Sequence, residues 1–161
     1  MIIHGYTRHQ NNCSVQYPDL GHIGIDDVLL DGEAAATNEF GRIDFERIME
    51  RFSLKKLDKI RKGAENRSIN FIAFDILRYK GKDLRSYPLS HRKGLLGSLN
   101  FQNPHIGVIP YIQTEGERLF VQMVALNMEG MVAKRANSIY VSGRSKAWLK
   151  VINWTLMWMC T

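Results

Sequence analysis

Cysteine, proline and long apolar runs are all scarce in this chain of 161 residues. Its two cysteines, Cys13 and Cys160, are too few for a disulfide framework and suit a reducing compartment. No apolar run approaches the ~20 residues that a membrane-spanning helix needs. The first residues show neither the basic nor the apolar region of a secretory signal. We therefore expect a cytoplasmic globular protein, and not a secreted or membrane-spanning one.

What the chain has in quantity is apolar material and positive charge. Hydrophobic residues make up 45% of the sequence, which is enough for a core, and the length suits one domain. Lys and Arg number 22 against 16 Asp and Glu, so the net charge is +6 and the isoelectric point is near 9.4. Positive charge permits binding to phosphate-rich partners, because each neutralised phosphate releases counterions, and also to membrane surfaces. Charge alone does not choose between these partners.

Hydrophobic patterning predicts an α+β fold with mixed, largely antiparallel sheets and flanking helices. Apolar runs predict strands over residues 1–6, 27–37, 69–79, 106–112, 129–135 and 147–154. Helical spacing predicts helices over residues 43–52, 88–99 and 116–127, and a turn is expected at 38–41. The stretch 55–67 is interpreted as a charged connector whose lysines form a solvated face.

The helices carry expectations about capping and burial. Asp44 lies near the start of the first helix, and Ser90 is a possible N-cap of the second. The side chains expected to face the core are Phe45, Ile48, Met49 and Phe52 in the first helix and Leu119, Phe120, Met123, Val124 and Leu126 in the third.

Two of the predicted strands carry acidic residues that suit ligand binding. In Leu30-Asp-Gly-Glu33 a carboxylate follows an apolar run, where Glu33 suits binding to a sugar hydroxyl. A strand end or a bulge with solvated acids explains the same pattern. In Phe71-Ile-Ala-Phe-Asp75, Phe74 suits stacking on a base, and Asp75 suits a metal or a neighbouring cation. A phenylalanine of the core is the simpler explanation of Phe74.

In the segment Glu129-Gly-Met-Val-Ala-Lys134, the directions of the two charged side chains depend on whether a turn is present. Strict strand alternation sends Glu129 and Lys134 to opposite faces, whereas a turn at Gly130 lets both point at one phosphate–metal cluster. Further on, Lys150 lies in an otherwise apolar strand, where a phosphate partner or exposure to solvent is needed to offset burial of its charge. Arg144 precedes that strand as a second cation.

In combination these segments are far more specific than any one of them. The chain contains, in order, Tyr6-Thr-Arg8, Leu-Asp-Gly-Glu33, Phe-Asp-Ile-Leu-Arg-Tyr-Lys-Gly-Lys-Asp-Leu, Glu-Gly-Met-Val-Ala-Lys134 and Trp-Leu-Lys150. This set resembles the nucleotidyltransferase (adenylation) domain of ATP-dependent DNA ligases, and most of all the small bacillus and phage-type enzymes. The resemblance covers residues 1–154, leaves 155–161 as a short unmatched tail, and implies the fold of a ligase adenylation domain.

The resemblance implies a role for each matching residue. Glu33 is similar to the glutamate that accepts from the ribose hydroxyl, and Phe74 to the aromatic ring that stacks on adenine. Glu129 resembles the carboxylate that supports the divalent metal, and Asp75 a structural or metal-linked acid. The implied phosphate contacts are Arg8, Lys134, Arg144 and Lys150. The implied ligands are ATP or AMP with Mg²⁺, and the implied partner is nicked duplex DNA and not a membrane.

The sequence departs from the family pattern at one essential point. The family's nucleophile is a lysine in a Lys-x-Asp-Gly motif one strand upstream of the segment around Arg8, and here the first lysines are Lys55 and Lys56. No OB-fold sequence follows Trp154. We therefore expect a partial adenylation domain that does not adenylate itself as an isolated chain. A separate chain or a missing segment would have to supply the nucleophile and the OB domain.

Three functional readings follow. The first is a ligase-family protein, whose full enzymes seal nicks through adenylyl transfer in DNA repair, replication and recombination. The second is a non-enzymatic prophage or pseudogene remnant that binds nucleotide or DNA by charge. The third is a relative of the RNA-capping nucleotidyltransferases, which use GTP.

Overall fold

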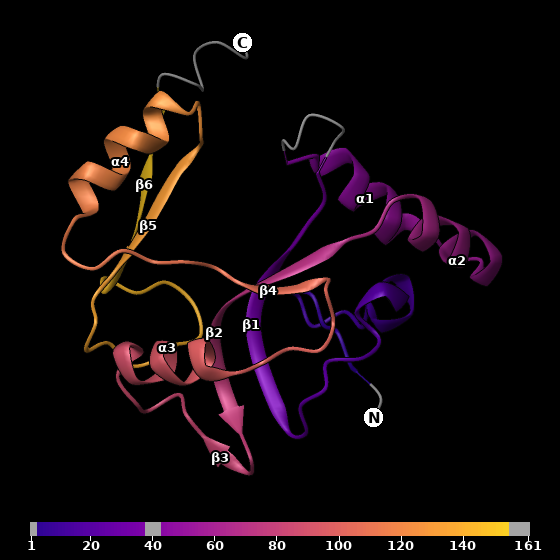
Figure 1. The fold of residues 1–161 in the computed structure, drawn as a ribbon, viewed down its shortest axis with the longest axis horizontal. Coiled ribbons are helices and arrows are strands. Elements are labelled where there is room, and N and C mark those ends of the chain that lie inside the picture. The colour runs from indigo at the N-terminus through magenta and orange to yellow at the C-terminus, as the bar shows by residue number, and fades with distance from the viewer. Residues whose placement is uncertain (1–2, 38–42, 155–161) are drawn as a thin grey trace. The chain divides into compact units, whose positions relative to one another are not determined.

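The structure is a computed structural model that describes residues 3–37 and 43–154 (Figure 1). The chain divides into two compact units. Unit 1 contains residues 1–84 and 93–109, and unit 2 contains residues 85–92 and 110–161. The expected α+β class is confirmed, because short mixed sheets are combined with helices in the described residues. None of the helices in the described part of the chain is long and apolar enough to cross a bilayer.

Unit 1 is built on two long antiparallel strands. β1 (Val28–Ala35) pairs with β2 (Asn70–Tyr79), and both strands lie within apolar runs that predicted strands. β2 then turns at Lys80 and Gly81, both with positive φ, into the short β3 (Lys82–Asp83). On the edge away from β1, β2 also pairs in parallel with β4 (Ile106–Val108). β4 is shorter than the expected 106–112, because Pro110 follows it and cannot donate a ladder hydrogen bond.

In the N-terminal segment, the described residues 3–6 do not form the strand expected over residues 1–6. In its described part only Tyr6 makes an isolated bridge, to Asn12, and residues 7–11 form a tight turn. Two short 3₁₀ helices, Ser14–Gln16 and Pro18–Leu20, follow. The turn expected at 38–41 lies outside the described residues.

Two helices follow β1 in unit 1 and lie beside each other (Figure 1). α1 (Phe45–Ser53) begins where expected, with the Asp44 carboxylate accepting from the backbone N–H of Arg47 at 3.1 Å. The expectation of an apolar core face was wrong for two of its four residues, because Phe45 is 65% and Met49 is 52% exposed. The fully buried residue of α1 is Arg51.

α2 (Leu57–Asn66) is a helix where the sequence predicted only a connector. Its buried side is narrow and centred on Ile60, which is 2% exposed, and Leu57 on the same stripe remains exposed. A single buried apolar residue gives a weak periodic signal, so the surrounding charges dominated the pattern.

α3 (Leu89–Ser98) begins without a side-chain cap of the expected kind. Ser90 is the second helical residue and not the N-cap. Instead, backbone carbonyls of Ser138 and Ala136 accept from the first two helical N–H groups, those of Leu89 and Ser90, at 2.8 and 2.9 Å. These partners are far away in sequence, so no local pattern could reveal them.

Unit 2 contains an antiparallel pair and a covering helix. β5 (Gly130–Lys134) pairs with β6 (Trp148–Ile152), and α4 (Gly116–Ala125) packs against β5. Both strands and the helix were predicted. The expected core face of α4 holds for Leu119, Phe120 and Met123, which are half-buried, but Val124 and Leu126 are exposed.

Gly32 of β1 is required by a close approach of the two strands. A Cβ at this position would lie 2.6 Å from the Ile72 carbonyl oxygen and 2.4 Å from the Phe71 ring. We expect Gly32→Ala to lower the free energy of unfolding by about 2–3 kcal/mol, because the backbone oxygen cannot move without disturbing the ladder. Thermal or urea unfolding followed by circular dichroism measures this loss.

The control for Gly32→Ala is Gly94→Ala on an exposed turn of α3, where a Cβ meets nothing within 4 Å. There the substitution is expected to be neutral or to stabilise by up to about 1 kcal/mol, since alanine favours helix over glycine. Equal stability of the two variants would contradict the proposed crowding at Gly32.

Candidate functional site

In unit 1 the predicted sugar-binding and base-stacking residues lie on paired strands. Glu33 is exposed on β1 opposite Ile72 of β2. The register shifts between Asp31 and Gly32, so that Gly32 faces Ala73 while Asp31 faces Asp75, and Phe74 is the extra residue of a bulge. Bulges next to binding sites commonly re-aim one side chain out of the regular pleat. Glu33 and Phe74 therefore lie on the same strand pair, and Phe74 lies at one of its two register shifts.

Asp75 is a buried structural acid in the described structure. It is fully buried, and its Oδ1 accepts from the backbone N–H of Ile76 at 2.9 Å. Lys93 of α3 is also buried, and desolvation lowers the pKa of its ammonium while the negative charge of Asp75 raises it. Of the two roles considered for Asp75, this arrangement favours the neighbouring cation over the metal.

In unit 2 the β5–β6 pair gathers charges on one face. Val132 lies opposite Lys150 and Lys134 opposite Trp148, and residues two apart on a strand share a face, so Lys134 and Lys150 point to the same side. Glu129 reaches that side as well, because its carboxylate forms an ion pair with the Lys150 ammonium. The turn considered at Gly130 is not formed, because Gly130 lies in β5 opposite Ile152, yet Glu129 and Lys150 are in contact.

Gly130 has an unusual backbone conformation at the start of β5. Its φ is +142°, in a region that L side chains rarely adopt, and a Cβ there would lie 2.0 Å from the Val151 carbonyl oxygen. This close approach to β6 requires glycine at the residue next to Glu129.

Lys134 is held above an aromatic ring. Its ammonium nitrogen lies 3.8 Å from the ring centre of Trp148, a cation–π contact. Trp148 is fixed in turn: its indole N–H donates to the Ser138 hydroxyl at 3.0 Å, and its ring meets Tyr140 edge to face at 5.6 Å. A lysine on a fixed platform keeps its charge directed at one place, which suits binding of a phosphate.

The two predicted arginines are not brought into these clusters by any recorded contact. Arg8 is exposed in the turn over residues 7–11, and Arg144 is exposed in the loop before β6. Within the described part of the chain neither side chain has a recorded hydrogen bond or ion pair. Their phosphate-binding roles stay predictions.

A magnesium ion fits this site only together with a nucleotide. No group of three or more His, Cys, Asp or Glu residues among those described could hold a metal by itself. Mg²⁺ is commonly held by one or two carboxylates with substrate phosphates and waters completing the octahedron. Glu129, beside two lysines that suit phosphate, provides one such carboxylate.

Three residues of these clusters were missed by the sequence reasoning. Lys93 and Ser138 have no distinctive neighbours in sequence, and all three residues matter through a partner on another element. For Trp148 a signal did exist, because it stands two residues before Lys150 and so must share its face.

Comparison with known proteins identifies the family. A family model described as "ATP dependent DNA ligase domain" matches residues 3–151. The chain belongs to the ATP-dependent DNA ligase family. This ligase-family chain is 39% identical over 151 residues to the SPbeta prophage-derived DNA ligase-like protein LigB of Bacillus subtilis (strain 168), with 92% of the chain and 53% of LigB aligned. It is 32% identical to a DNA ligase of Methanothrix thermoacetophila, with 91% of the chain and 28% of that enzyme aligned.

Solved structures agree with this assignment. The ligase domain of LigD from M. tuberculosis aligns with a TM-score of 0.69 at 25% identity, over 92% of this chain and 46% of that one. A mycobacterial DNA ligase D complexed with ATP and MES aligns with a TM-score of 0.70 at 24% identity, over 92% of this chain and 47% of that one, which shows the shared fold. The ligase-family chain thus spans about half the length of LigB and less of the other relatives.

Proposed function

We propose that this chain is the nucleotide-binding part of an ATP-dependent DNA ligase system, and that it binds ATP or AMP and nicked duplex DNA. The observation that carries the proposal is the single charged face of β5–β6, where Glu129 is paired with Lys150 and Lys134 lies over Trp148. Two cations and one carboxylate on one face suit a phosphate with its divalent metal. Family membership supports the same ligand.

Each cluster is assigned to a part of the nucleotide. Glu33, an exposed acceptor on β1, binds the ribose hydroxyl, and Phe74 at the bulge of β2 stacks on adenine. The buried charges of Asp75 and Lys93 attract each other and hold β2 against α3 next to Phe74. Asp75 therefore acts as a structural acid in this proposal.

Lys134 and Lys150 hold the α-phosphate, with Arg144 and Arg8 as further phosphate contacts. Adenylyl transfer builds negative charge on phosphate oxygens, and cations fixed before the reaction stabilise that charge where it develops. When bound, Mg²⁺ would supply further charge stabilisation at the same oxygens, with Glu129 as its protein ligand. On binding phosphate, Lys150 exchanges its contact with Glu129 for one with the nucleotide.

A role in DNA repair is part of the proposal. One relative, 34% identical over 145 residues, is the bifunctional non-homologous end joining protein LigD of Bacillus subtilis. Nick sealing in replication and recombination, and a cytoplasmic location, are further expectations from the family and from the two cysteines.

The proposal makes a sharp prediction about covalent chemistry. We expect the 161-residue chain to bind ATP reversibly in the presence of Mg²⁺ and to form no covalent lysyl-AMP, because no lysine stands upstream of Lys55 to act as the family nucleophile. Equilibrium binding with a fluorescent ATP analogue measures the first part, and gel analysis with labelled ATP measures the second. A labelled protein band would overturn the second part, and absence of ATP binding would overturn the proposal.

The same assay separates the other readings. Stronger binding of GTP than of ATP would favour a capping-type nucleotidyltransferase. Binding of DNA without any nucleotide would favour a non-enzymatic remnant, a reading motivated by the missing upstream lysine. An in-frame Lys-x-Asp-Gly encoded upstream of Met1 would restore the enzyme.

A further inference from the structure

We propose that the exposed face of α2 together with the preceding lysines, which we call the basic α2 surface, binds the phosphate backbone of duplex DNA. The inference rests on the proposed function, since it names a surface for the DNA partner. Between residues 55 and 67 this surface carries two acids, Asp58 and Glu65, and the six cations Lys55, Lys56, Lys59, Arg61, Lys62 and Arg67, all exposed.

Most of these cations have no acidic partner. Arg67 pairs with Glu50, but the structure records no ion pair between any other of the six and a described residue. The local acids stand three or four residues from a cation, as Asp58 does from Lys62, and even so no pair forms within 4.0 Å. Like charges crowded on a helix repel one another, and a polyanion relieves that repulsion while releasing its own counterions.

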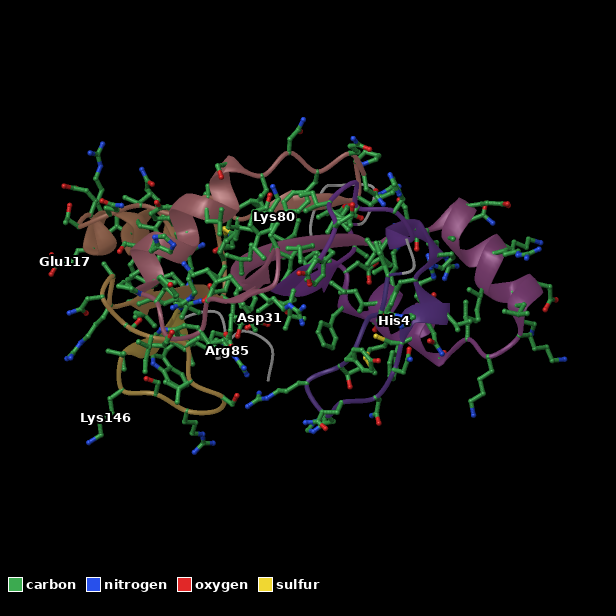
Figure 2. All side chains as sticks on the ribbon, turned by 90° about the horizontal axis from the view of Figure 1, so that it is seen from below. His4, Asp31, Lys80, Arg85, Glu117 and Lys146 are labelled. Atoms are coloured by element: carbon green, nitrogen blue, oxygen red, sulfur yellow. The ribbon has the colours of Figure 1, made fainter. Side chains whose placement is uncertain are left out.

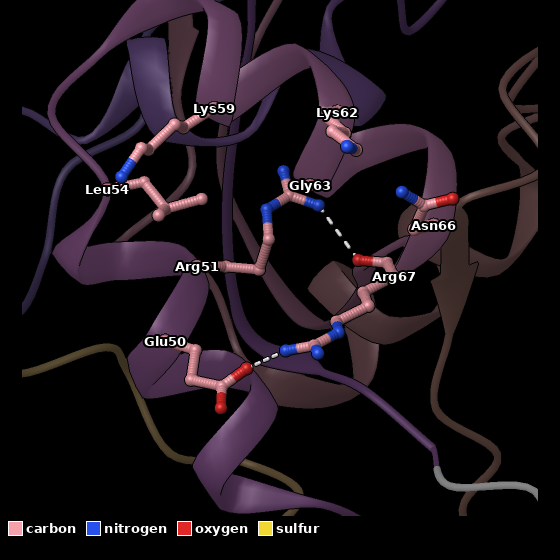
Figure 3. Close-up of a pocket in the computed structure, with 8 residues that line it drawn as sticks. All are labelled: Glu50, Arg51, Leu54, Lys59, Lys62, Gly63, Asn66 and Arg67. Atoms are coloured by element: carbon pink, nitrogen blue, oxygen red, sulfur yellow. Dashed lines mark hydrogen bonds and ion pairs between the residues drawn. The ribbon is translucent and has the colours of Figure 1, made fainter.

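A hollow adjoins this surface on the side that faces α1 (Figure 3). It lies between α1 and α2, has a volume of about 270 Å³, and is lined by Lys59, Lys62, Asn66 and Arg67 of the surface and by the Glu50 carboxylate that pairs with Arg67. Lys59, Lys62 and Asn66 follow one flank of α2 at helical spacing, so their side chains leave the helix in the same direction. The cations at the rim, and not the hollow itself, are the groups that suit a DNA phosphate.

The floor of the hollow is rigid. Arg51 is 1% exposed, and its guanidinium donates to both carboxylate oxygens of Asp19, at 2.7 and 3.3 Å, and to the backbone carbonyl of Arg67 at 2.8 Å. Above it, α2 comes so close that a Cβ on Gly63 would lie 3.2 Å from Arg51 Cδ. Because the two helices are packed closely here, the backbone positions from which the rim cations extend are fixed relative to each other.

The place of this surface in unit 1 suits a backbone contact. Ala35, the last residue of β1, lies opposite Asn70, the first of β2, and α1 and α2 are found beyond this end of the strand pair (Figure 1). Glu33 stands two residues before that end. The surface offers ammonium and guanidinium groups with a single amide, so it is expected to hold DNA without reading its sequence.

The test is DNA binding over a series of salt concentrations. The probe is a fluorescent nicked duplex of about 25 base pairs, the readout is anisotropy, and the variant is the double substitution K59Q/K62Q. Each phosphate contact contributes about 0.9 to the slope of log K against log salt, so we expect the slope to fall by about 1–2 and the affinity by about tenfold at low salt. Far-UV circular dichroism checks that α2 remains folded.

Two controls keep the interpretation unambiguous. K80Q/K146Q removes the same charge from exposed lysines outside α2, both labelled in Figure 2, and should weaken binding by less than about twofold. K59R/K62R keeps the charge and should bind as the unchanged chain does. If K80Q/K146Q weakens binding as much as K59Q/K62Q, or if K59Q/K62Q has no effect, the basic α2 surface is not the contact.

Further arms separate the other outcomes. Inorganic phosphate that displaces the duplex beyond the effect of ionic strength would show a small-anion site and overturn the proposal. ATP affinity of K59Q/K62Q should equal that of the unchanged chain. If the chain binds ATP but K59Q/K62Q does not change DNA binding, this inference fails and the proposed function stands. A chain that binds neither ATP nor DNA refutes both.

Discussion

Gly130→Ala is expected to disrupt the β5–β6 pair and to lower the free energy of unfolding of unit 2 by about 4 kcal/mol. Two costs add: the backbone at φ +142° is strained for any residue with a side chain, and the new Cβ would lie 2.0 Å from the Val151 carbonyl oxygen. For a chain of this length such a loss corresponds to a fall of about 10 °C in melting temperature. Differential scanning calorimetry measures it.

Gly143→Ala is the matched control for this substitution. Gly143 has a φ of +110°, also in the glycine-favouring region, but a Cβ there meets nothing within 4 Å. It should therefore lose only the strain contribution, about 1–2 kcal/mol. If both variants lose the same amount, the close approach to Val151 is not what makes Gly130 necessary.

Lys150→Met is expected to weaken ATP binding by about 10–100-fold. A hydrogen bond to a charged group contributes about 1.5–3 kcal/mol, which is one to two powers of ten in affinity. Methionine keeps most of the length of the side chain and removes only the charge. Titration with ATP in the presence of Mg²⁺, followed by isothermal calorimetry, provides the measurement.

Lys146→Met serves as the comparison, because Lys146 is exposed in the same segment and carries the same charge. It should change ATP affinity by less than about twofold. Equal effects of Lys146→Met and Lys150→Met would refute a specific phosphate contact.

Glu129→Gln is expected to have the opposite effect on ATP binding. Without Mg²⁺ it should tighten the binding slightly, since it removes the anion that competes for Lys150. The side chains of Lys150 and Glu129 are 56% and 73% exposed, so the gain should stay below about 1 kcal/mol.

The elements that the sequence predicted well are those with a strong local cause. β1 and β2 follow from long apolar runs. The order of chemical segments was enough to place the chain in its family. Local pattern thus sufficed for the strands β1, β2, β5 and β6, and the order of segments sufficed for the family.

What could not be predicted depends on partners far apart in the chain. The start of α3 is satisfied by carbonyls of Ser138 and Ala136, and Lys134 is oriented by Trp148. The bulge that sets Phe74 apart is a property of two paired strands, and no single strand displays it. The sequence suggested a bulge only as an alternative explanation of the acids near Gly32, without saying which residue would be the extra one.

α1 shows how tertiary contacts override an amphipathic pattern. Its apolar stripe predicted burial of Phe45 and Met49, yet the most buried side chain of the helix is Arg51. Burial of an arginine requires partners for its charge, and Asp19, Gln16 and Arg67 accept from its two terminal nitrogens, whereas its Nε has no hydrogen-bond partner among the described residues. Such a group of partners cannot be deduced from helical periodicity.

The buried Arg51 has a consequence for the dynamics of unit 1. Through Asp19 and Gln16 it fastens the N-terminal segment to α1, and through the Arg67 carbonyl it fastens the end of α2 to the same point. Moving any one of these segments away would remove partners of the buried Arg51 guanidinium, which water does not reach. The cost in free energy would be about 3–5 kcal/mol. The three segments should therefore open and close as one cooperative block, with their amide hydrogens exchanging together and not by independent fraying.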